Sequence, residues 1–255
     1  MSGAGPGAGR ELRTLLDAVS AGLRHGAAEL WREEGLRERY GRYLVTMHTV
    51  IRASVPLMEL ALARSRTALA ADGGGGGEAR VLRALVRHLP RHIAEETGHD
   101  AWLLRDMRRA GLDPARELAA PPAASVAGLV GAQYYWVAHF HPVCLLGYVA
   151  ALELHAPSPR LAGLLAARTG LPREAFETVR VHAEVDGGHS DAVLAVLDEA
   201  DPGPELRRGV RMSALHTLRG LTDVLGELAG RPGTEATGTA GPATVPAETS
   251  ERTRA

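Results

Sequence analysis

Long stretches of this sequence place apolar residues three and four positions apart, and clusters of proline and glycine separate the stretches. That spacing gathers apolar side chains on one face of an α-helix, and it recurs over most of the chain. No segment sustains the alternation of apolar and polar residues that marks a half-buried strand, and the sequence holds only two isoleucines and two phenylalanines. We therefore predict an all-α protein with a single helical domain.

The proline and glycine clusters divide the chain into six or seven helices. Pro56, Pro90 and Pro142 fall inside three of the longer ones, where each is expected to kink the helix without ending it. The glycine run Gly73–Gly77 is an expected linker, and the proline- and alanine-rich stretch 113–124 is an expected loop. The expected helices span residues 11–34, 36–71, 78–110, 125–155, 161–168, 172–200 and 205–228.

Both ends of the chain lack helical periodicity. Residues 1–10 are rich in glycine and alanine, and residues 230–255 consist largely of Gly, Pro, Thr, Glu and Ala. Such compositions bury too little apolar surface to offset the entropy lost on ordering, so we predict disordered tails over both segments. The helical domain is expected to span residues 11–229, which is long enough to build a sizeable core.

The charge and hydropathy of the chain argue against two classes of partner. A net charge of -1 gives no electrostatic attraction to nucleic acid or to an anionic membrane. Charged residues recur too often for any stretch to span a bilayer, and the first ten residues lack the apolar core of a signal peptide. We therefore expect a cytoplasmic protein with no nucleic-acid and no membrane partner.

Cys144 is the only cysteine in the sequence. One cysteine excludes an intramolecular disulfide and any metal site built from several thiolates of one chain. Because the residue lies in an apolar run, we interpret it as a small buried side chain.

His182, Asp186 and His189 form the sharpest group of polar residues, spaced four and then three positions apart in an expected helix. At about 100° per residue they occupy an arc of about 60°, so their side chains point the same way. Glu184 lies away from that arc and is expected to face solvent or another helix. A single histidine on an apolar face is more often a core residue than a ligand, but three ligand-type side chains together are costly to bury unpaired. This helix therefore favours a metal site.

Glu96 and His99 supply a second group, three positions apart in the stretch HIAEETGHD. The Glu-x-x-His pair is the arrangement that helical bundles use in di-iron carboxylate sites. Glu95 is an alternative to Glu96, since it lies four positions before His99, and His92 is a further candidate seven positions before it. Pairs of this kind are also common on solvated helix faces, so the motif alone is weak.

Glu153 supplies the third group, near the end of the expected helix 125–155. The preceding turns are apolar, so the carboxylate is expected to point inward, where it needs a partner. The alternative is a capping or surface glutamate close to the helix end.

Three imidazoles and three carboxylates are enough for two ions if one carboxylate bridges them. Nitrogen and oxygen ligands without thiolate suit iron or manganese. Two ferrous ions would bring four positive charges against three carboxylates, and the residual positive charge would favour an anionic ligand. The candidate metal ligands are Glu96, His99, Glu153, His182, Asp186 and His189.

Three segments of the chain resemble the haem-oxygenase-like di-iron oxidases and oxygenases, also described as iron-containing redox enzymes. The segments are EETGHDAWLLRDMRRAGLDP, HPVCLLGYVAALELHAP and HAEVDGGHSD, of which the last is the most specific. The resemblance implies a seven-helix bundle like that of haem oxygenase. It also implies that the six candidate ligands bind two Fe(II) ions per chain, with Glu153 as the bridge and dioxygen as co-substrate. Members of this family often hold the second iron weakly. Gly187 and Gly188 within the ligand helix would allow that helix to loosen, or would allow another helix to approach closely.

The implied activity is oxidation of a small amino-acid-like or carboxylate substrate in secondary metabolism, by N-oxygenation, desaturation or C–C cleavage. The resemblance implies that residues 43–61 of this chain contact substrate. We interpret His48 and Glu59 in that segment as core or surface residues. An external electron donor and a homodimer are compatible with the family. Four aromatic residues near Glu153 could wall a pocket, although helix packing is the favoured role for most of them: Tyr134, Tyr135, Trp136 and Tyr148.

Three other functions compete with this interpretation. A same-fold enzyme without di-iron chemistry, thiaminase-like or a cofactorless oxidase, would use the same side chains as acids and bases. A haem oxygenase would need an axial histidine near the N-terminus, where His25 is available. A non-catalytic helical module would leave six converging ligands without a purpose.

Overall fold

The computed structural model describes residues 7–71 and 76–230, except for the side chains of residues 185–187. Within those ranges every regular element is a helix and none is a strand, which confirms the all-α prediction. The α-helices are α1 (Ala8–Val19), α2 (Ala21–Leu30), α3 (Leu36–Ile51), α4 (Ser54–Ala71), α5 (Gly76–Glu96), α6 (His99–Arg109), α7 (Pro114–Glu117), α8 (Ala124–Tyr135), α9 (Leu145–Glu153), α10 (Leu161–Thr169), α11 (Glu177–Ala200) and α12 (Pro204–Leu228). Three shorter helices complete the fold: the π-helix η1 (Trp136–Phe140) and the 3-10 helices η2 (Pro142–Cys144) and η3 (Arg173–Phe176).

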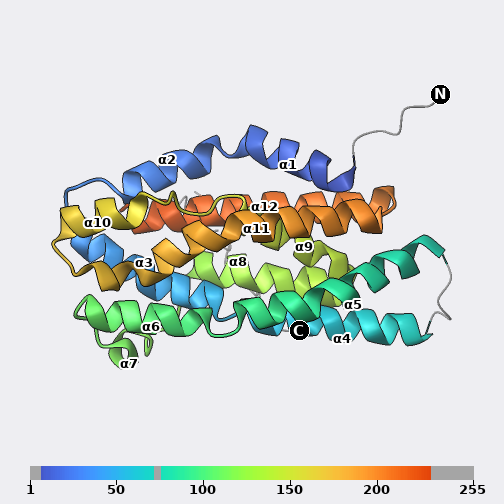
Figure 1. The fold of residues 1–255 in the computed structure, drawn as a ribbon, viewed down its shortest axis with the longest axis horizontal. Helices are drawn as coiled ribbons and strands as arrows, with labels where there is room; N and C mark the ends of the chain where they lie inside the picture. Colours follow the sequence, from blue (N-terminus) through green and yellow to red (C-terminus); the bar gives the residue numbers. More distant parts are fainter. Residues whose placement is uncertain (1–6, 72–75, 231–255) are drawn as a thin grey trace, which may run out of the picture.

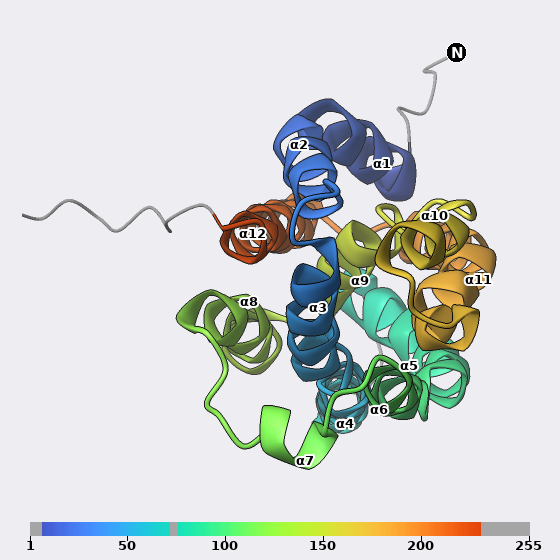
Figure 2. The same ribbon diagram turned by 90° about the vertical axis from the view of Figure 1, so that its left-hand side faces the viewer.

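The longer helices run roughly along one axis and surround α9, as Figure 1 and the end view in Figure 2 show. Helix α12 packs along α9, α2 and α8, while α4 pairs with α5 and α1 lies against α11. Gly147 permits the close approach of α9 to α12, since a Cβ there would lie 2.3 Å from the carbonyl oxygen of Val210. Eight of the nine residues of α9 are buried, so the last of them, Glu153, reaches into the interior of the bundle.

Several of the long helices expected from the sequence are divided into shorter ones. The chain turns at Ser20 between α1 and α2, and at residues 52–53 between α3 and α4. Pro56 does not cause the second break, because it lies in the first turn of α4, where a missing N–H costs nothing. Pro90 likewise lies inside α5 without ending it. The expected helix 36–71 is therefore broken at residues 52–53 and not at Pro56, whereas Pro90 lies within its helix without ending it, as expected.

The expected helix 78–110 ends at Glu96 and restarts at His99. Gly98 separates α5 from α6 with a φ of 91°, a conformation that residues with a Cβ rarely adopt. The expected helix 125–155 is interrupted by η1 and η2, since His141 is extended and Pro142 begins a new helix. These two breaks turn the chain next to the candidate ligands.

Two other boundaries differ from the expected ones. Residues 8–10 are helical although the sequence predicts a disordered tail, because the N–H of Gly9 donates to the Asp198 carboxylate of α11 over 2.7 Å. Helix α7 lies in the stretch expected to be a loop. Residues 1–6, residues 231–255 and most of the expected linker, residues 72–75, lie outside the described ranges.

The start of α11 is fixed from another helix. Asp106 of α6 is fully buried, and its two carboxylate oxygens accept from the N–H groups of Glu177 (3.2 Å) and Thr178 (2.8 Å). Burial raises the pKa of Asp106, and these helix N–H groups oppose that rise. Glu177 is also bound by Arg105 and Arg109 of α6. Because α11 carries three candidate ligands, this cap sets their position along the bundle.

None of the described helices is both long enough and apolar enough to cross a membrane.

Candidate metal centre

Four side chains from three helices converge inside the bundle. Each offers one ligand atom, and these atoms all lie within 4.8 Å of one another. His92 and Glu96 come from α5, Glu153 from the end of α9 and His189 from α11. Their side chains are between 3% and 17% exposed. We call these four residues the open cluster.

The open cluster leaves hydrogen-bonding capacity unused. His92 Nε2 lies 3.0 Å from Glu153 Oε1, while His189 Nδ1 lies 3.8 Å from Glu96 Oε1 and 3.9 Å from Glu153 Oε1. Glu153 Oε2 and His189 Nδ1 are buried and have no hydrogen-bond partner among the described residues. Buried polar atoms without partners are costly, and a bound cation would satisfy both. The donor set, two imidazoles and two carboxylates, fits iron.

One pair in the open cluster holds a proton where a cation would bind. Burial alone would lower the pKa of His92, but the hydrogen bond and charge of Glu153 outweigh burial and raise it. Burial raises the pKa of Glu153, and His92 opposes that rise. Both shifts favour a proton shared between the two side chains, so a cation that binds them would displace it.

His88 supports His92 from the preceding turn of α5. Its Nε2 lies 3.2 Å from His92 Nδ1, and burial lowers the pKa of His88 to about 4. A neutral His88 can accept the Nδ1 proton of His92, which directs His92 Nε2 towards Glu153. Metal-binding histidines commonly use their second ring nitrogen in this way.

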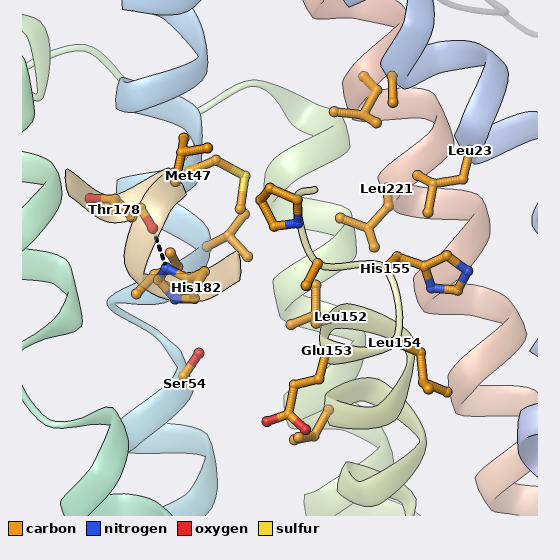
Figure 3. A pocket seen from close by; sticks show the side chains of 18 of the residues that line it. Leu23, Met47, Ser54, Leu152, Glu153, Leu154, His155, Thr178, His182 and Leu221 are labelled. Atoms are coloured by element: carbon orange, nitrogen blue, oxygen red, sulfur yellow. Dashed lines mark hydrogen bonds between the residues drawn. The ribbon is translucent and has the colours of Figure 1, made fainter. Parts of the chain in front are cut away.

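His99 and His182 lie beside Glu96 and extend the centre. His99 Nδ1 is 3.3 Å from Glu96 Oε2, and the rings of His99 and His182 are 5.2 Å apart and nearly perpendicular. The Nδ1 proton of His182 is donated to the carbonyl of Thr178 over 2.9 Å (Figure 3), so Nε2 carries the free lone pair. Burial lowers the pKa of His182, which keeps this nitrogen available to a cation. Trp102 stacks on His99 with ring centroids 4.0 Å apart and restrains its ring.

The structure gathers most of the side chains that the sequence indicates. Glu96, Glu153 and His189 belong to the open cluster, and His99 and His182 lie next to it. The side chain of the sixth predicted ligand, Asp186, is outside the described residues.

Three details differ from the expected arrangement. Glu96 and His99 are not one turn apart in a single helix, because Gly98 interrupts it. Glu95 is 35% exposed and pairs with Arg91, whereas Glu96 is 12% exposed, although Glu95 Oε2 also lies 3.8 Å from His189 Nε2. His92 joins the cluster although the sequence ranks it only as a further candidate, and its spacing of one turn before Glu96 is the signal that indicates it.

A cavity of about 600 Å³ adjoins the centre. Its polar end includes His92, Glu96, Glu153 and His182, and its walls come mainly from apolar residues of α2, α3, α4, α9 and α12. Figure 3 shows Met47 and His182 on one side of the space and Leu221 on the other. The segment 43–61, expected to contact substrate, contributes six lining residues: Tyr43, Met47, Val50, Ile51, Ser54 and Met58.

The other residues that the sequence indicates differ in whether they reach the cavity. Of the four aromatic residues expected on the same helix as Glu153, Tyr148 lines the cavity, whereas Tyr134 and Tyr135 are exposed and lie on α8. His48 is buried and Glu59 exposed, and neither lines the cavity. Cys144 is buried, as expected, and burial raises its pKa to about 12, so it is not a thiolate at neutral pH.

Two further residues bear on the ligand helix α11. A Cβ at Gly188 would meet no atom within 4 Å, so close helix packing does not explain this glycine. Glu184 is exposed and pairs with Arg180, which confirms that it faces away from the ligands.

Comparisons with known proteins agree with this arrangement. Residues 78–221, more than half of the chain and all of its candidate ligands, match a family described as iron-containing redox enzyme. A domain of unknown function with a haem-oxygenase-like fold from Shewanella denitrificans superposes with a TM-score of 0.62 at 17% identity, covering 86% of this chain and 89% of that one. A TenA homologue from Pseudomonas syringae pv. tomato superposes with a TM-score of 0.65 at 14% identity, covering 86% and 91%. No curated protein matches the chain. The two structures confirm the haem-oxygenase-like fold.

Proposed function

The chain belongs to the family of iron-containing redox enzymes, and from this premise we propose that it is a non-haem di-iron oxidase or oxygenase. The observation that supports the proposal best is the open cluster, in which two imidazoles and two carboxylates converge with buried atoms left unpaired. A bundle core gains nothing from such a group unless a cation completes it.

Seven residues would hold the two ions. His92, Glu153 and His189 would bind one ion, and His99 and His182 the other. Asp186 is included as a ligand that the sequence predicts. Glu96 approaches both groups, since its Oε1 lies 3.8 Å from His189 and its Oε2 lies 3.3 Å from His99. We therefore assign the bridging role to Glu96, not to Glu153 as the family resemblance implies. Ferrous ions bound here would supply the electrons and the Lewis acidity needed to activate dioxygen.

The protein's own residues prepare the reaction in two ways. His88 and Thr178 orient the rings of His92 and His182 through their Nδ1 atoms, so that each Nε2 is free to bind. The apolar cavity walls exclude water from the reacting centre and leave room for a small organic substrate.

The substrate is proposed to carry a carboxylate. Two ferrous ions would bring four positive charges, and the three carboxylates of Glu96, Glu153 and Asp186 would bring three negative ones. The exposed Glu95 is left aside, so an anion would complete the balance. N-oxygenation, desaturation and C–C cleavage of an amino-acid-like or fatty carboxylate are all consistent with this proposal. An external electron donor, a homodimer, a cytoplasmic location and a role in secondary metabolism stay predictions.

The decisive experiment measures iron and oxygen together. The protein is purified without oxygen, titrated with Fe(II) and exposed to dioxygen, while bound iron and oxygen consumption are measured. We expect about two irons per chain and oxygen consumption that disappears with a ferrous chelator. Failure to bind iron, or His182→Ala and Glu153→Ala variants that behave like the wild type, would disprove the proposal.

A same-fold enzyme without iron chemistry is the second candidate, because the TenA homologue shares the fold. Its carboxylates and histidines would act as acids and bases, so its activity would survive chelation. A haem oxygenase receives no support, since His25 is exposed on α2 and does not line the cavity.

A further inference from the structure

Tyr148 is a buried phenol whose hydroxyl has no hydrogen-bond partner in the part of the chain that the structure describes. The residue lies on α9, is 1% exposed and lines the cavity next to the metal centre. A second buried tyrosine, Tyr40, shows the usual arrangement, because its hydroxyl donates to the carbonyl of Ala175 over 2.6 Å. Buried tyrosine hydroxyls nearly always find such a partner. The hydroxyl of Tyr148 therefore lacks a hydrogen-bond acceptor that the described residues do not supply.

Tyr148 lines the same cavity as His92, Glu96 and Glu153 of the open cluster. Burial is the main cause of a raised pKa of Tyr148, and the charge of Glu96 adds to it, so the phenol stays protonated. Tyr148 is thus a hydrogen-bond donor at physiological pH.

The remainder of the cavity is apolar. Leu145 and Leu152 continue the face of α9 on which Tyr148 lies, one helical turn to either side, and the adjacent Val149 also lines the cavity. The opposite walls add side chains of the same kind, among them Leu23, Leu30, Met47, Met58, Leu221 and Leu225. Figure 3 shows Leu23 and Leu221 on the side of the space opposite Met47. A ligand that fills this space is mostly hydrocarbon and needs one hydrogen-bond acceptor near the metal centre.

From these observations we propose that Tyr148 binds the polar head of an amphipathic substrate, an aliphatic carboxylate whose hydrocarbon body occupies the apolar part of the cavity. The inference rests on the proposed function for the identity of the head group as a carboxylate. Donation from Tyr148 holds one head-group oxygen beside the ligands, and the apolar walls hold the chain. This arrangement selects substrates by chain length, and a free amino acid with a polar side chain is a poor match.

The test uses two probes, so that it does not depend on iron. Linear amides from butanamide to decanamide present a neutral acceptor to the metal-free protein, in which an anionic head would be repelled by Glu96 and Glu153. Decanoate is then used with the Fe(II)-loaded protein under anaerobic conditions. Binding is followed by calorimetry and by the fluorescence of tryptophan, since Trp31 lines the cavity. We expect each added methylene to strengthen binding about fourfold until the cavity is full.

Tyr148→Phe keeps the ring and removes the donor. We expect it to weaken binding of both decanamide and decanoate about tenfold, with an unchanged melting temperature, because the hydroxyl has no partner to lose. Tyr40→Phe is the matched control: it breaks a buried hydrogen bond, so the melting temperature should fall while both affinities stay the same.

Three outcomes overturn the inference. They are no binding of either probe by the wild type, affinities that do not rise with chain length, and equal affinities in Tyr148→Phe and wild type. If decanamide binds as expected but iron is not taken up, the proposed di-iron function fails and the amphipathic site stands.

Discussion

The bundle contains two buried polar clusters that differ in whether their atoms are paired. The first, which we call the closed cluster, consists of Gln133 on α8 and of Ser213 and Thr217 on α12, all fully buried. Ser213 Oγ donates to Gln133 Oε1 over 3.1 Å, and Gln133 Nε2 donates to Thr217 Oγ1 over 3.2 Å and to the carbonyl of Leu129 over 3.3 Å. Thr217 Oγ1 in turn donates to the carbonyl of Ser213 over 2.8 Å. Every side-chain polar atom of this cluster has a partner.

The open cluster of His92, Glu96, Glu153 and His189 is somewhat less buried, with side chains 3% to 17% exposed, and it is incomplete. Within the described part of the chain, Glu153 Oε2 and His189 Nδ1 have no hydrogen-bond partner, whereas every side-chain polar atom of the closed cluster has one. A satisfied network holds two helices together and needs nothing else. An unsatisfied one is destabilising unless a ligand completes it. Pairing, rather than burial or polarity, therefore separates a functional cluster from a structural one in this molecule.

The largest effect is expected when a ligand of the open cluster is removed. Glu153→Ala should reduce bound iron from about two ions per chain to one or none. Oxygen-dependent activity should fall by more than the roughly 10- to 100-fold loss that accompanies removal of an outer-sphere partner. Iron analysis and oxygen consumption measure both effects. A variant that keeps its full iron content would show that the unpaired atoms of the open cluster do not mark a metal site.

Loss of His88 should have the next largest effect. His88→Leu removes the acceptor for His92 Nδ1 and frees that ring to adopt the other tautomer, so iron affinity should fall roughly 10- to 100-fold. His88→Gln offers an amide oxygen in place of the ring nitrogen and should restore much of the affinity. Nitrogen NMR of the metal-free protein reports the tautomer of His92 directly. The role of His88 would be contradicted by a Leu variant in which both the tautomer and the iron affinity are unchanged.

Sequence patterns predicted the fold class and indicated most of the residues that converge at the candidate metal centre. Apolar spacing indicates helices wherever the structure has long ones, because burial of one helix face imposes that spacing. The His182 and His189 positions follow from the same periodicity. Helix breaks such as the one at Gly98 were harder to predict, because a glycine inside a helical pattern either is tolerated within the helix or ends it. The choice between those outcomes depends on how α6 packs against α3 and η3.

Pairing across helices could not be predicted from the sequence. His92 and Glu153 are 61 positions apart, and nothing in either local segment shows that their atoms lie 3.0 Å apart. The same limit applies to Asp106, whose carboxylate caps a helix that begins far along the chain. Exposure likewise decides between Glu95 and Glu96, and it depends on how the neighbouring helices cover the end of α5.

Disruption of the closed cluster should affect stability and leave iron binding unchanged. Gln133→Ala leaves the hydroxyl of Ser213 without its acceptor and opens a small cavity, so the free energy of unfolding should fall by about 2 to 3 kcal/mol. A triple variant, Gln133→Leu with Ser213→Ala and Thr217→Val, removes all partners together and should be much closer to the wild type. Urea unfolding and iron analysis provide the two measurements. Iron loss in a folded Gln133→Ala protein would show that the two clusters are coupled.

The smallest effect concerns His141, which has one unpaired buried nitrogen and lies outside the open cluster. Its Nδ1 accepts from the N–H of Val143 over 3.0 Å, and burial together with the charge of Arg64 lowers its pKa to about 4. Below the ordinary histidine pKa of about 6.5 the unfolded chain binds a proton that the folded protein does not, so stability is lost as the pH falls from about 6.5 towards 4. Glu78, whose carboxylate lies 3.7 Å from Nε2, is exposed and offsets this only weakly.

His141→Asn keeps an acceptor for Val143 but does not titrate. The decrease in unfolding free energy between pH 7 and pH 5 should therefore be about 1 to 2 kcal/mol smaller in this variant than in the wild type. Comparing how the free energy of unfolding changes with pH in the two proteins removes two other contributions. A loss of packing in the variant does not depend on pH, and the other buried histidines titrate in both proteins. Equal slopes would mean that His141 is protonated without cost in the folded state. Iron content should not change, because a single unpaired nitrogen lacks the gathered carboxylates that distinguish the open cluster.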